Sequence, residues 1–113
     1  MVRLTEDTAK ALGMPLQRSA QLGVLTDLAY VQLEGRGVMS VDLGFPIRYS
    51  HSPCEVVDLT DLERLTELVQ RMLNEKGYAC GSADGIFGAK TESAVKSYQK
   101  AKGLSADGIV GNN

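Results

Sequence analysis

The residues of this 113-residue chain that could do chemistry are few, and their spacing matches no complete catalytic set. His51 is the single histidine, whereas a catalytic zinc site needs about three protein ligands and a two-metal site needs more. The two cysteines, Cys54 and Cys80, lie in no motif that would place a thiol beside His51 as nucleophile and base. They are interpreted as ordinary buried thiols, with a disulfide between them as the alternative. We therefore expect no catalytic residue in this chain.

A short phrase occurs twice near the C-terminus, as Ala83-Asp84-Gly85-Ile86-Phe87-Gly88 and as Ala106-Asp107-Gly108-Ile109-Val110-Gly111. A glycosidase would need two carboxylates facing each other across a cleft, and Asp84 and Asp107 are the candidates. Each, however, stands in an Asp-Gly turn, where glycine supplies a positive φ and the aspartate closes the turn through its own side chain. The repeat therefore indicates a small recognition module and not a catalytic centre.

Two helices must position these turns. Thr60-Asp61-Leu62-Glu63 reads as a capping box, and it predicts a helix from Asp61 to about Lys76 that ends at Gly77. The apolar residues that support this helix follow a helical spacing: Leu62, Leu65, Leu68, Val69, Met72 and Leu73. A second helix is predicted from Thr91 to about Lys102, ending at Gly103, with Ala94, Val95, Tyr98 and Ala101 on one face.

The N-terminal half mixes helical and extended patterns. The predicted elements are a helix over Arg3–Leu12, a loose strand over Leu16–Leu22, a short helix over Thr26–Leu33, a strand over Val38–Gly44, a loop over Phe45–Pro53 and a short extended piece over Val56–Leu59. The expected fold class is therefore α+β. The edge of the Val38–Gly44 strand would be exposed in so short a lobe, which predicts self-association through that edge.

Charge and hydropathy exclude several partners. The formal net charge of -2 predicts no electrostatic grip on nucleic acid or on an anionic membrane. The chain has no run of about 18 apolar residues, and its first seven residues become acidic where a signal peptide needs an apolar run. We expect no membrane partner and no export signal in the chain as given.

The C-terminal half resembles the peptidoglycan-binding domain, a bundle of about three helices appended to bacterial and phage cell-wall hydrolases. The resemblance covers about Leu62 to Gly111 and is carried by these residues in order: Gly77-Tyr78, Asp84-Gly85-Ile86-Phe87-Gly88, Thr91, Ala94-Val95, Tyr98-Gln99, Gly103-Leu104 and Asp107-Gly108-Ile109-Val110-Gly111. We expect a groove for peptidoglycan beside the turns, lined by Asp84, Phe87, Tyr98, Gln99 and Asp107, with Phe87 and Tyr98 as core residues in the alternative interpretation. That family continues with a threonine and a final short helix, so the third helix is expected to be incomplete here.

The N-terminal half resembles the last ~70 residues of the dinuclear-metal aminopeptidases of the glutamyl and deblocking group, a family often labelled cellulase or endoglucanase. The matching residues are Met14-Pro15-Leu16-Gln17, Thr26-Asp27-Leu28-Ala29, Glu34-Gly35-Arg36-Gly37-Val38, the run from Gly44 to Pro53, and Glu55-Val56-Val57-Asp58-Leu59. The resemblance implies that His51 binds one of two catalytic metal ions, zinc or cobalt, in a longer parent. The other ligands lie upstream in such enzymes, so no cofactor is expected in the isolated chain.

Together these patterns predict a small α/β lobe over residues 1–60 that shares a central helix with a helical module of about three helices over residues 61–113. The expected function is non-catalytic binding of peptidoglycan, which would keep an attached hydrolase at the bacterial cell wall. The alternative is a C-terminal segment of a dinuclear-metal aminopeptidase that needs upstream residues for activity.

Overall fold

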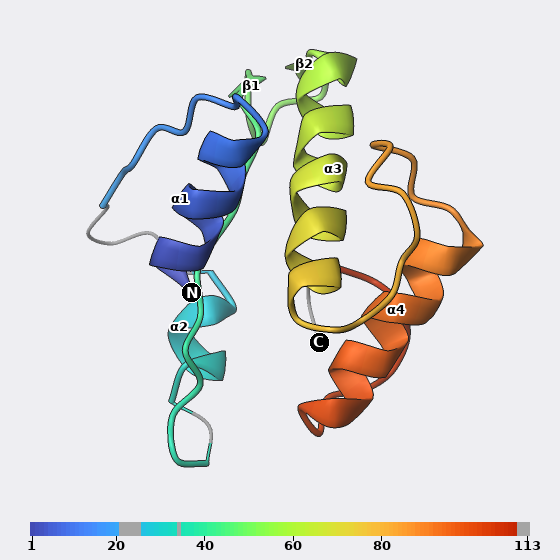
Figure 1. Ribbon diagram of the computed structural model, residues 1–113. Coiled ribbons are helices and arrows are strands. Elements are labelled where there is room, and N and C mark those ends of the chain that lie inside the picture. The colour runs from blue at the N-terminus through green and yellow to red at the C-terminus, as the bar shows by residue number, and fades with distance from the viewer. Residues whose placement is uncertain (21–25, 34, 111–113) are drawn as a thin grey trace. The chain divides into compact units, whose positions relative to one another are not determined.

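The structure is a computed structural model that describes residues 1–20, 26–33 and 35–110. Its described part is α+β and mostly helical, as predicted (Figure 1). The elements are α1 (Val2–Ala11), α2 (Leu28–Val31), β1 (Ile47–Arg48), β2 (Val56–Val57), α3 (Leu59–Glu75) and α4 (Ala89–Ala101). The chain divides into two compact units, Met1–Leu43 and Gly44–Asn113, and each is described by itself.

In the first unit, α1 confirms the helix predicted over Arg3–Leu12. The helix is followed by Gly13, whose φ of +66° allows Met14 N–H to donate to the carbonyl of Ala9 at 2.9 Å. Thr5, Thr8 and Ala9 are its buried residues. The helix α2 lies inside the segment predicted as a short helix.

The strand predicted over Val38–Gly44 is wrong, because these residues are irregular in the structure. They are held by hydrogen bonds of another kind: Val38 N–H donates to the carbonyl of Gln32 at 3.1 Å, and Thr26 Oγ1 donates to Asp42 Oδ2 at 2.6 Å. High β-propensity forms a strand only where a neighbouring strand completes the ladder. The self-association predicted through this edge loses its structural basis.

The predictions of a loose strand over Leu16–Leu22 and of a loop over Phe45–Pro53 also differ from the structure. In the loose strand over Leu16–Leu22, residues 16–20 are irregular, and residues 21 and 22 lie outside the described residues. The loop over Phe45–Pro53 contains β1, which pairs antiparallel with β2 in the register Ile47 to Val57 and Arg48 to Val56. The loop prediction is therefore wrong for these two residues, since the partner at β2 supplies the ladder that β1 needs.

The helix α3 confirms the predicted amphipathic helix but begins one residue before the proposed box. Its N-cap is Asp58, whose Oδ1 accepts from Thr60 N–H at 2.9 Å, so the capping box at Thr60 is wrong. The helix ends as predicted at Gly77, whose φ is +85°, and Tyr78 N–H donates to the carbonyl of Leu73 at 2.9 Å.

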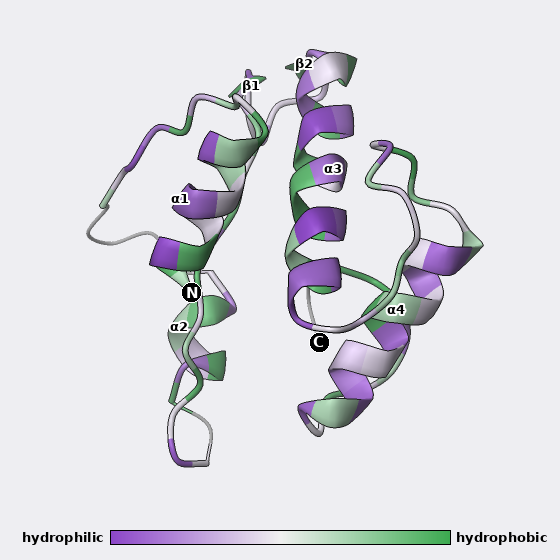
Figure 2. Cartoon of the chain, viewed as in Figure 1, coloured by the Kyte–Doolittle hydropathy of each residue, from purple (hydrophilic) through white to green (hydrophobic). Residues whose placement is uncertain are grey.

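The core of the second unit lies between α3 and α4. Four buried residues form it, and three partly buried residues pack against them: Leu73, Cys80, Ala94 and Val95, with Val69, Tyr78 and Tyr98. The rings of Tyr78 and Tyr98 meet edge to face, with centroids 5.4 Å apart and an interplanar angle of 84°. Green and purple alternate along both helices in Figure 2, as the predicted spacing requires, although Ala101, predicted on the apolar face, is exposed.

Candidate functional site

The first Asp-Gly turn is closed by a glutamine from the preceding helix. Asp84 Oδ1 accepts from the backbone N–H of Ile86 at 3.0 Å and from Gln70 Nε2 at 3.1 Å. Gln70 Nε2 also donates to the carbonyl of Ile86 at 2.9 Å, and Gln70 Oε1 accepts from Gly85 N–H at 3.0 Å. One buried amide on α3 therefore holds the turn at three points, the backbone N–H of Gly85, the backbone carbonyl of Ile86 and the carboxylate of Asp84.

The second turn repeats these four hydrogen bonds with a glutamine of α4. Asp107 Oδ1 accepts from Ile109 N–H at 2.9 Å and from Gln99 Nε2 at 2.9 Å. Gln99 Nε2 donates to the carbonyl of Ile109 at 3.0 Å, and Gln99 Oε1 accepts from Gly108 N–H at 2.9 Å. We call each set, Gln70 with Asp84-Gly85-Ile86 and Gln99 with Asp107-Gly108-Ile109, a glutamine-closed corner.

Glycine is required at both corners. Gly85 has φ +78°, and a Cβ there would lie 2.9 Å from the backbone oxygen of Glu63. Gly108 has φ +81°, and a Cβ there would lie 2.8 Å from both Glu92 Cγ and Lys96 Cε. Each corner thus packs closely against the helix that carries its glutamine. At Gly85 the neighbour is backbone, which leaves no room for a Cβ, and at Gly108 the neighbours are side chains and the positive φ favours glycine.

Gln70 was not among the predicted site residues, although the sequence carries a signal for it. Gln70 lies seven residues after Glu63, and Gln99 lies seven residues after Glu92, so the repeat extends from the turns into the helices. The two copies differ in the length of the connection, because Gln70 precedes Asp84 by 14 residues whereas Gln99 precedes Asp107 by 8. A glutamine on the apolar face of the predicted helix indicates a hydrogen-bonded contact, since a buried polar group needs partners.

The longer first connection has its own support. Asn74 Nδ2 donates to the carbonyl of Gly81 at 2.9 Å, and Asn74 Oδ1 accepts from Cys80 N–H at 3.0 Å. Gln70 also donates to Thr91 Oγ1 at 2.9 Å, which links the first corner to the start of α4. Within the described residues, no buried polar side-chain atom lacks a hydrogen-bond partner.

The carboxylate of the first corner is held in its ionised form. The backbone N–H of Ile86 lowers the pKa of Asp84 most, and the donated bond from Gln70 adds to the effect. In the ionised state the carboxylate is an acceptor only, which suits the two donors that face it. In the folded chain the Asp84 carboxylate therefore stabilises the turn as a charged hydrogen-bond acceptor.

The five residues predicted to line a peptidoglycan groove do not form a single cluster of contacts. Gln99 and Asp107 are hydrogen-bonded to each other, whereas Asp84 is bonded to Gln70. Tyr98 packs in the core with Lys102 Nζ 5.8 Å from its ring centroid, and Phe87 is exposed. The glutamine and the aspartates thus shape the corners, and Phe87 is the member of the set with an exposed aromatic side chain.

The loop between β1 and β2 carries His51, which is exposed and has a φ of +62°. Its backbone N–H donates to Glu55 Oε1 at 2.6 Å, and Ser52 N–H donates to the carbonyl of Tyr49 at 3.0 Å. In the described ranges, no three His, Cys, Asp or Glu side chains come together in a way that could hold a metal ion. These residues do not by themselves fit a dinuclear metal centre, which leaves the ligand role of His51 as a prediction.

The two cysteines are free thiols in different environments. Cys54 is exposed, so its expected burial is wrong, and Cys80 is buried as expected. Burial raises the pKa of the Cys80 thiol, whose Sγ lies 3.1 Å from the carbonyl oxygen of Gln70. The alternative of a disulfide between them is not formed in this structure.

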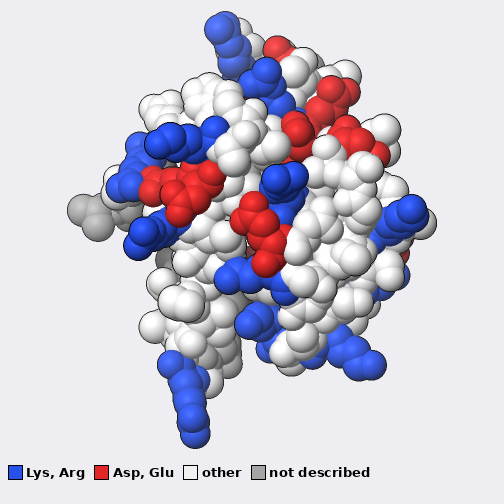
Figure 3. All heavy atoms as spheres, in the orientation of Figure 1, with Lys and Arg blue, Asp and Glu red and all other residues white. Residues whose placement is uncertain are grey.

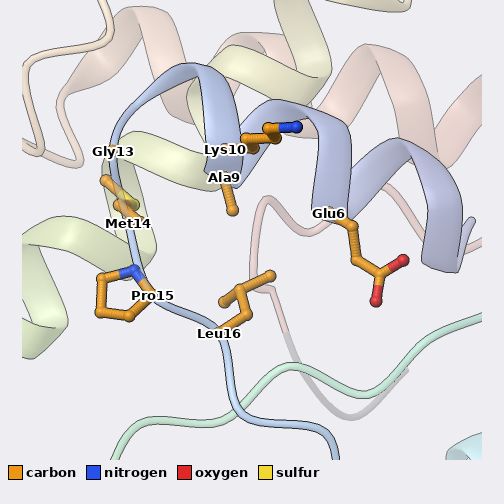
Figure 4. Close-up of a pocket in the computed structure, with 7 residues that line it drawn as sticks. All are labelled: Glu6, Ala9, Lys10, Gly13, Met14, Pro15 and Leu16. Atoms are coloured by element: carbon orange, nitrogen blue, oxygen red, sulfur yellow. The ribbon is translucent and has the colours of Figure 1, made fainter.

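Two hollows among the described residues are lined by residues that belong to neither corner. One, of about 410 Å³, lies between α1 and residues 13–16; Figure 4 shows the side chains of Ala9 and Leu16 directed toward one another in it. The other, of about 720 Å³, is lined by the β1–β2 hairpin and the start of α3. The groove beside the corners therefore stays a prediction.

The surface charge is mixed. On the face drawn in Figure 3, acidic and basic side chains are interspersed. None of the described helices is long and apolar enough to span a bilayer.

The hairpin loop that carries His51 and the helical segment with the two glutamine-closed corners fall in parts of the chain that match two different family models. The chain belongs to the M42 glutamyl aminopeptidase family, whose model matches residues 1–68. The model described as "Putative peptidoglycan binding domain" matches residues 65–113. The two matches overlap at residues 65–68, inside α3.

Curated relatives point to the same two families. The chain is 42% identical over 62 residues to "Putative aminopeptidase SgcX" of Escherichia coli, which covers 55% of this chain and 17% of the relative. It is 46% identical over 43 residues to "N-acetylmuramoyl-L-alanine amidase CwlM" of Mycobacterium tuberculosis, covering 38% of this chain and 11% of the relative. It is 31% identical over 74 residues to "Lysyl aminopeptidase" of Pyrococcus furiosus, covering 65% of this chain and 21% of the relative.

The chain therefore spans at most about a fifth of the length of these relatives. No solved structure matches the chain significantly.

Proposed function

We propose that the chain binds peptidoglycan without catalysis and keeps an attached hydrolase at the bacterial cell wall. The observation that carries the proposal is the pair of glutamine-closed corners within the segment that matches the peptidoglycan-binding family. The similarity of 43 residues to a cell-wall amidase supports it. A tether of this kind raises the local concentration of substrate around the tethered enzyme.

In this proposal the predicted site residues divide into two roles. Asp84, Gln99 and Asp107 hold the corners in shape, and Phe87 and Tyr98 supply aromatic surface near them. The proposed module is residues 61–113, which shares α3 with the lobe over residues 1–60; the overlap of the family matches at 65–68 supports this sharing. The proposed location is the cell wall.

Sedimentation with purified sacculi tests the proposal directly. The full chain is mixed with insoluble sacculi or with cellulose, an insoluble glucan that has no acetamido group and no peptide. We expect the chain to pellet with sacculi and to stay in solution with cellulose. Equal amounts of soluble chain in both mixtures would refute the proposal.

A second function is supported by membership of the M42 family and by two aminopeptidase relatives. In this alternative the chain is a segment of a dinuclear-metal aminopeptidase, and His51 holds zinc or cobalt together with ligands from elsewhere in a longer parent. Because the other ligands would come from a longer parent, calorimetric zinc titration of that parent and of its His51→Ala variant separates the two functions. Stoichiometric uptake that disappears in His51→Ala, together with release of N-terminal amino acids, would support the enzyme; absence of both would count against it.

A further inference from the structure

The polar groups of each corner are already used within the chain. The Asp84 carboxylate, the N–H groups of Gly85 and Ile86 and the carbonyl of Ile86 all take part in the hydrogen bonds of the first corner. The second corner uses the corresponding groups in the same way. A ligand that approaches either corner therefore meets side chains before it meets backbone.

Beside the exposed carboxylates of Asp84 and Asp107, those side chains are apolar. Ile86 is 68% exposed and Ile109 is 61% exposed, and each is followed by a second exposed apolar residue, Phe87 or Val110. We call these pairs, Ile86-Phe87 and Ile109-Val110, the apolar tips. Because the hydrogen bonds of the corner fix the isoleucine backbone, a tip loses little conformational freedom when it binds.

We propose that the two apolar tips are the contact residues of the peptidoglycan site, and that they bind the N-acetyl methyl groups of the glycan strand. This inference rests on the proposed function. The glycan strand is a regular polymer in which successive sugars carry an acetamido methyl group, and two equivalent tips suit a ligand with repeated equivalent groups. Isoleucine offers only apolar contact, so the matching ligand group must be apolar as well.

The charge of α4 suits the same polymer. The helix that carries the second corner has three lysines and one glutamate, Lys90, Lys96, Lys100 and Glu92. The stem peptides attached to the glycan carry carboxylates, so a cationic helix beside the tips attracts the wall polymer and does not repel it. Since Lys96 is paired with Glu92, Lys90 and Lys100 supply the attraction over a distance, and the tips supply the close contact.

The test compares the double variant Ile86→Ser/Ile109→Ser with the wild-type chain in sacculi sedimentation. Both side chains are exposed, so serine leaves the hydrogen bonds of the corners in place. We expect each single substitution to weaken binding by roughly tenfold and the double substitution by roughly a hundredfold. The matched control is Leu33→Ser/Leu59→Ser, which changes two apolar residues that are 75% and 69% exposed and belong to neither tip.

Far-UV circular dichroism verifies that both double variants keep their helices. If the wild type binds sacculi and the Ile86→Ser/Ile109→Ser variant binds them equally well, the role of the tips is refuted and the proposed function stands. Failure of the wild type to bind sacculi would overturn both. Equal losses in the tip variant and in the control variant would show non-specific apolar adhesion and would also overturn the inference.

A second measurement identifies the ligand group. Sacculi are chemically de-N-acetylated, and a portion is re-acetylated to restore the methyl groups. We expect the difference between wild type and the tip variant to disappear on the de-N-acetylated polymer and to return after re-acetylation, since a coupled pair loses its interaction when either partner is removed. A difference of the same size on all three polymers would refute the N-acetyl assignment.

Discussion

Replacing Gln99 by leucine is the sharpest test of the glutamine-closed corner. The side chain of Gln99 is buried and makes three hydrogen bonds, to Asp107 Oδ1 at 2.9 Å, to the carbonyl of Ile109 at 3.0 Å and from Gly108 N–H at 2.9 Å. Leucine has a similar volume but can replace none of these bonds. The buried N–H of Gly108 would then lack its acceptor, and the turn would lose its attachment to α4.

The size of the effect follows from these bonds. An unsatisfied buried N–H costs about 1 to 3 kcal/mol, and the bond to a carboxylate contributes about 1.5 to 3 kcal/mol. The apolar surface that leucine buries offsets about 1.5 to 3 kcal/mol of this loss. We therefore expect the free energy of unfolding to fall by about 2 kcal/mol, and by a similar amount in Gln70→Leu, whose corner has the same hydrogen bonds.

Urea unfolding followed by far-UV circular dichroism measures this change. With a typical slope of about 1.5 kcal/mol per molar urea, the midpoint should fall by about 1 to 1.5 M. The matched control is Lys100→Leu, the next residue along α4, which is exposed and should shift stability by less than about 0.5 kcal/mol. A Gln99→Leu midpoint equal to that of the control would refute the reasoning.

Three further outcomes are expected. Gly85→Ala should lower the free energy of unfolding by about 2 to 3 kcal/mol in urea, because its Cβ would meet the backbone oxygen of Glu63 at 2.9 Å at a φ of +78°; an unchanged midpoint would contradict the packing of the corner. Hydrogen bonds lower the pKa of Asp84 in the folded chain. Its contribution to the free energy of unfolding is therefore complete above its pKa in the unfolded chain, and is lost as the pH falls through its pKa in the folded chain. The difference in unfolding free energy between wild type and Asp84→Asn should therefore shrink below about pH 4, and a constant difference from pH 7 to pH 2 would argue against this role. A maleimide reagent should label exposed Cys54 within minutes in the native chain and buried Cys80 only after unfolding, as mass spectrometry would show; equal labelling rates would indicate that Cys80 is accessible.

The sequence predicted the helices well because their signals are local. α3 has apolar residues at helical spacing and a glycine with positive φ at its end, and both features act within a few residues. The N-cap was misplaced because Asp58 and Thr60 are both good capping residues. Asp58 is the N-cap in the structure because its backbone is extended, at φ -81° and ψ 122°, as an N-cap requires.

The strands were predicted less well because a strand depends on a distant partner. Val38–Gly44 has the stronger β-propensity, yet Ile47–Arg48 forms the strand since Val56–Val57 lies opposite it. The two turns were predicted from Asp-Gly alone, whereas the glutamines that close them lie 14 and 8 residues away in the chain. Such a contact is fixed by tertiary packing, and only the matched Glu63–Gln70 and Glu92–Gln99 spacing carried a trace of it.

The unequal connections of the two corners bear on how this segment can be engineered. The glutamine and the aspartate of a corner are 14 residues apart in one copy and 8 in the other. The entropic cost of closing the longer connection is greater by only about 0.5 kcal/mol. In the shorter copy, residues 104–106 are exposed. A peptide tag or fluorophore inserted there would lengthen the connection between Gln99 and Asp107 without removing the hydrogen bonds that join its two ends.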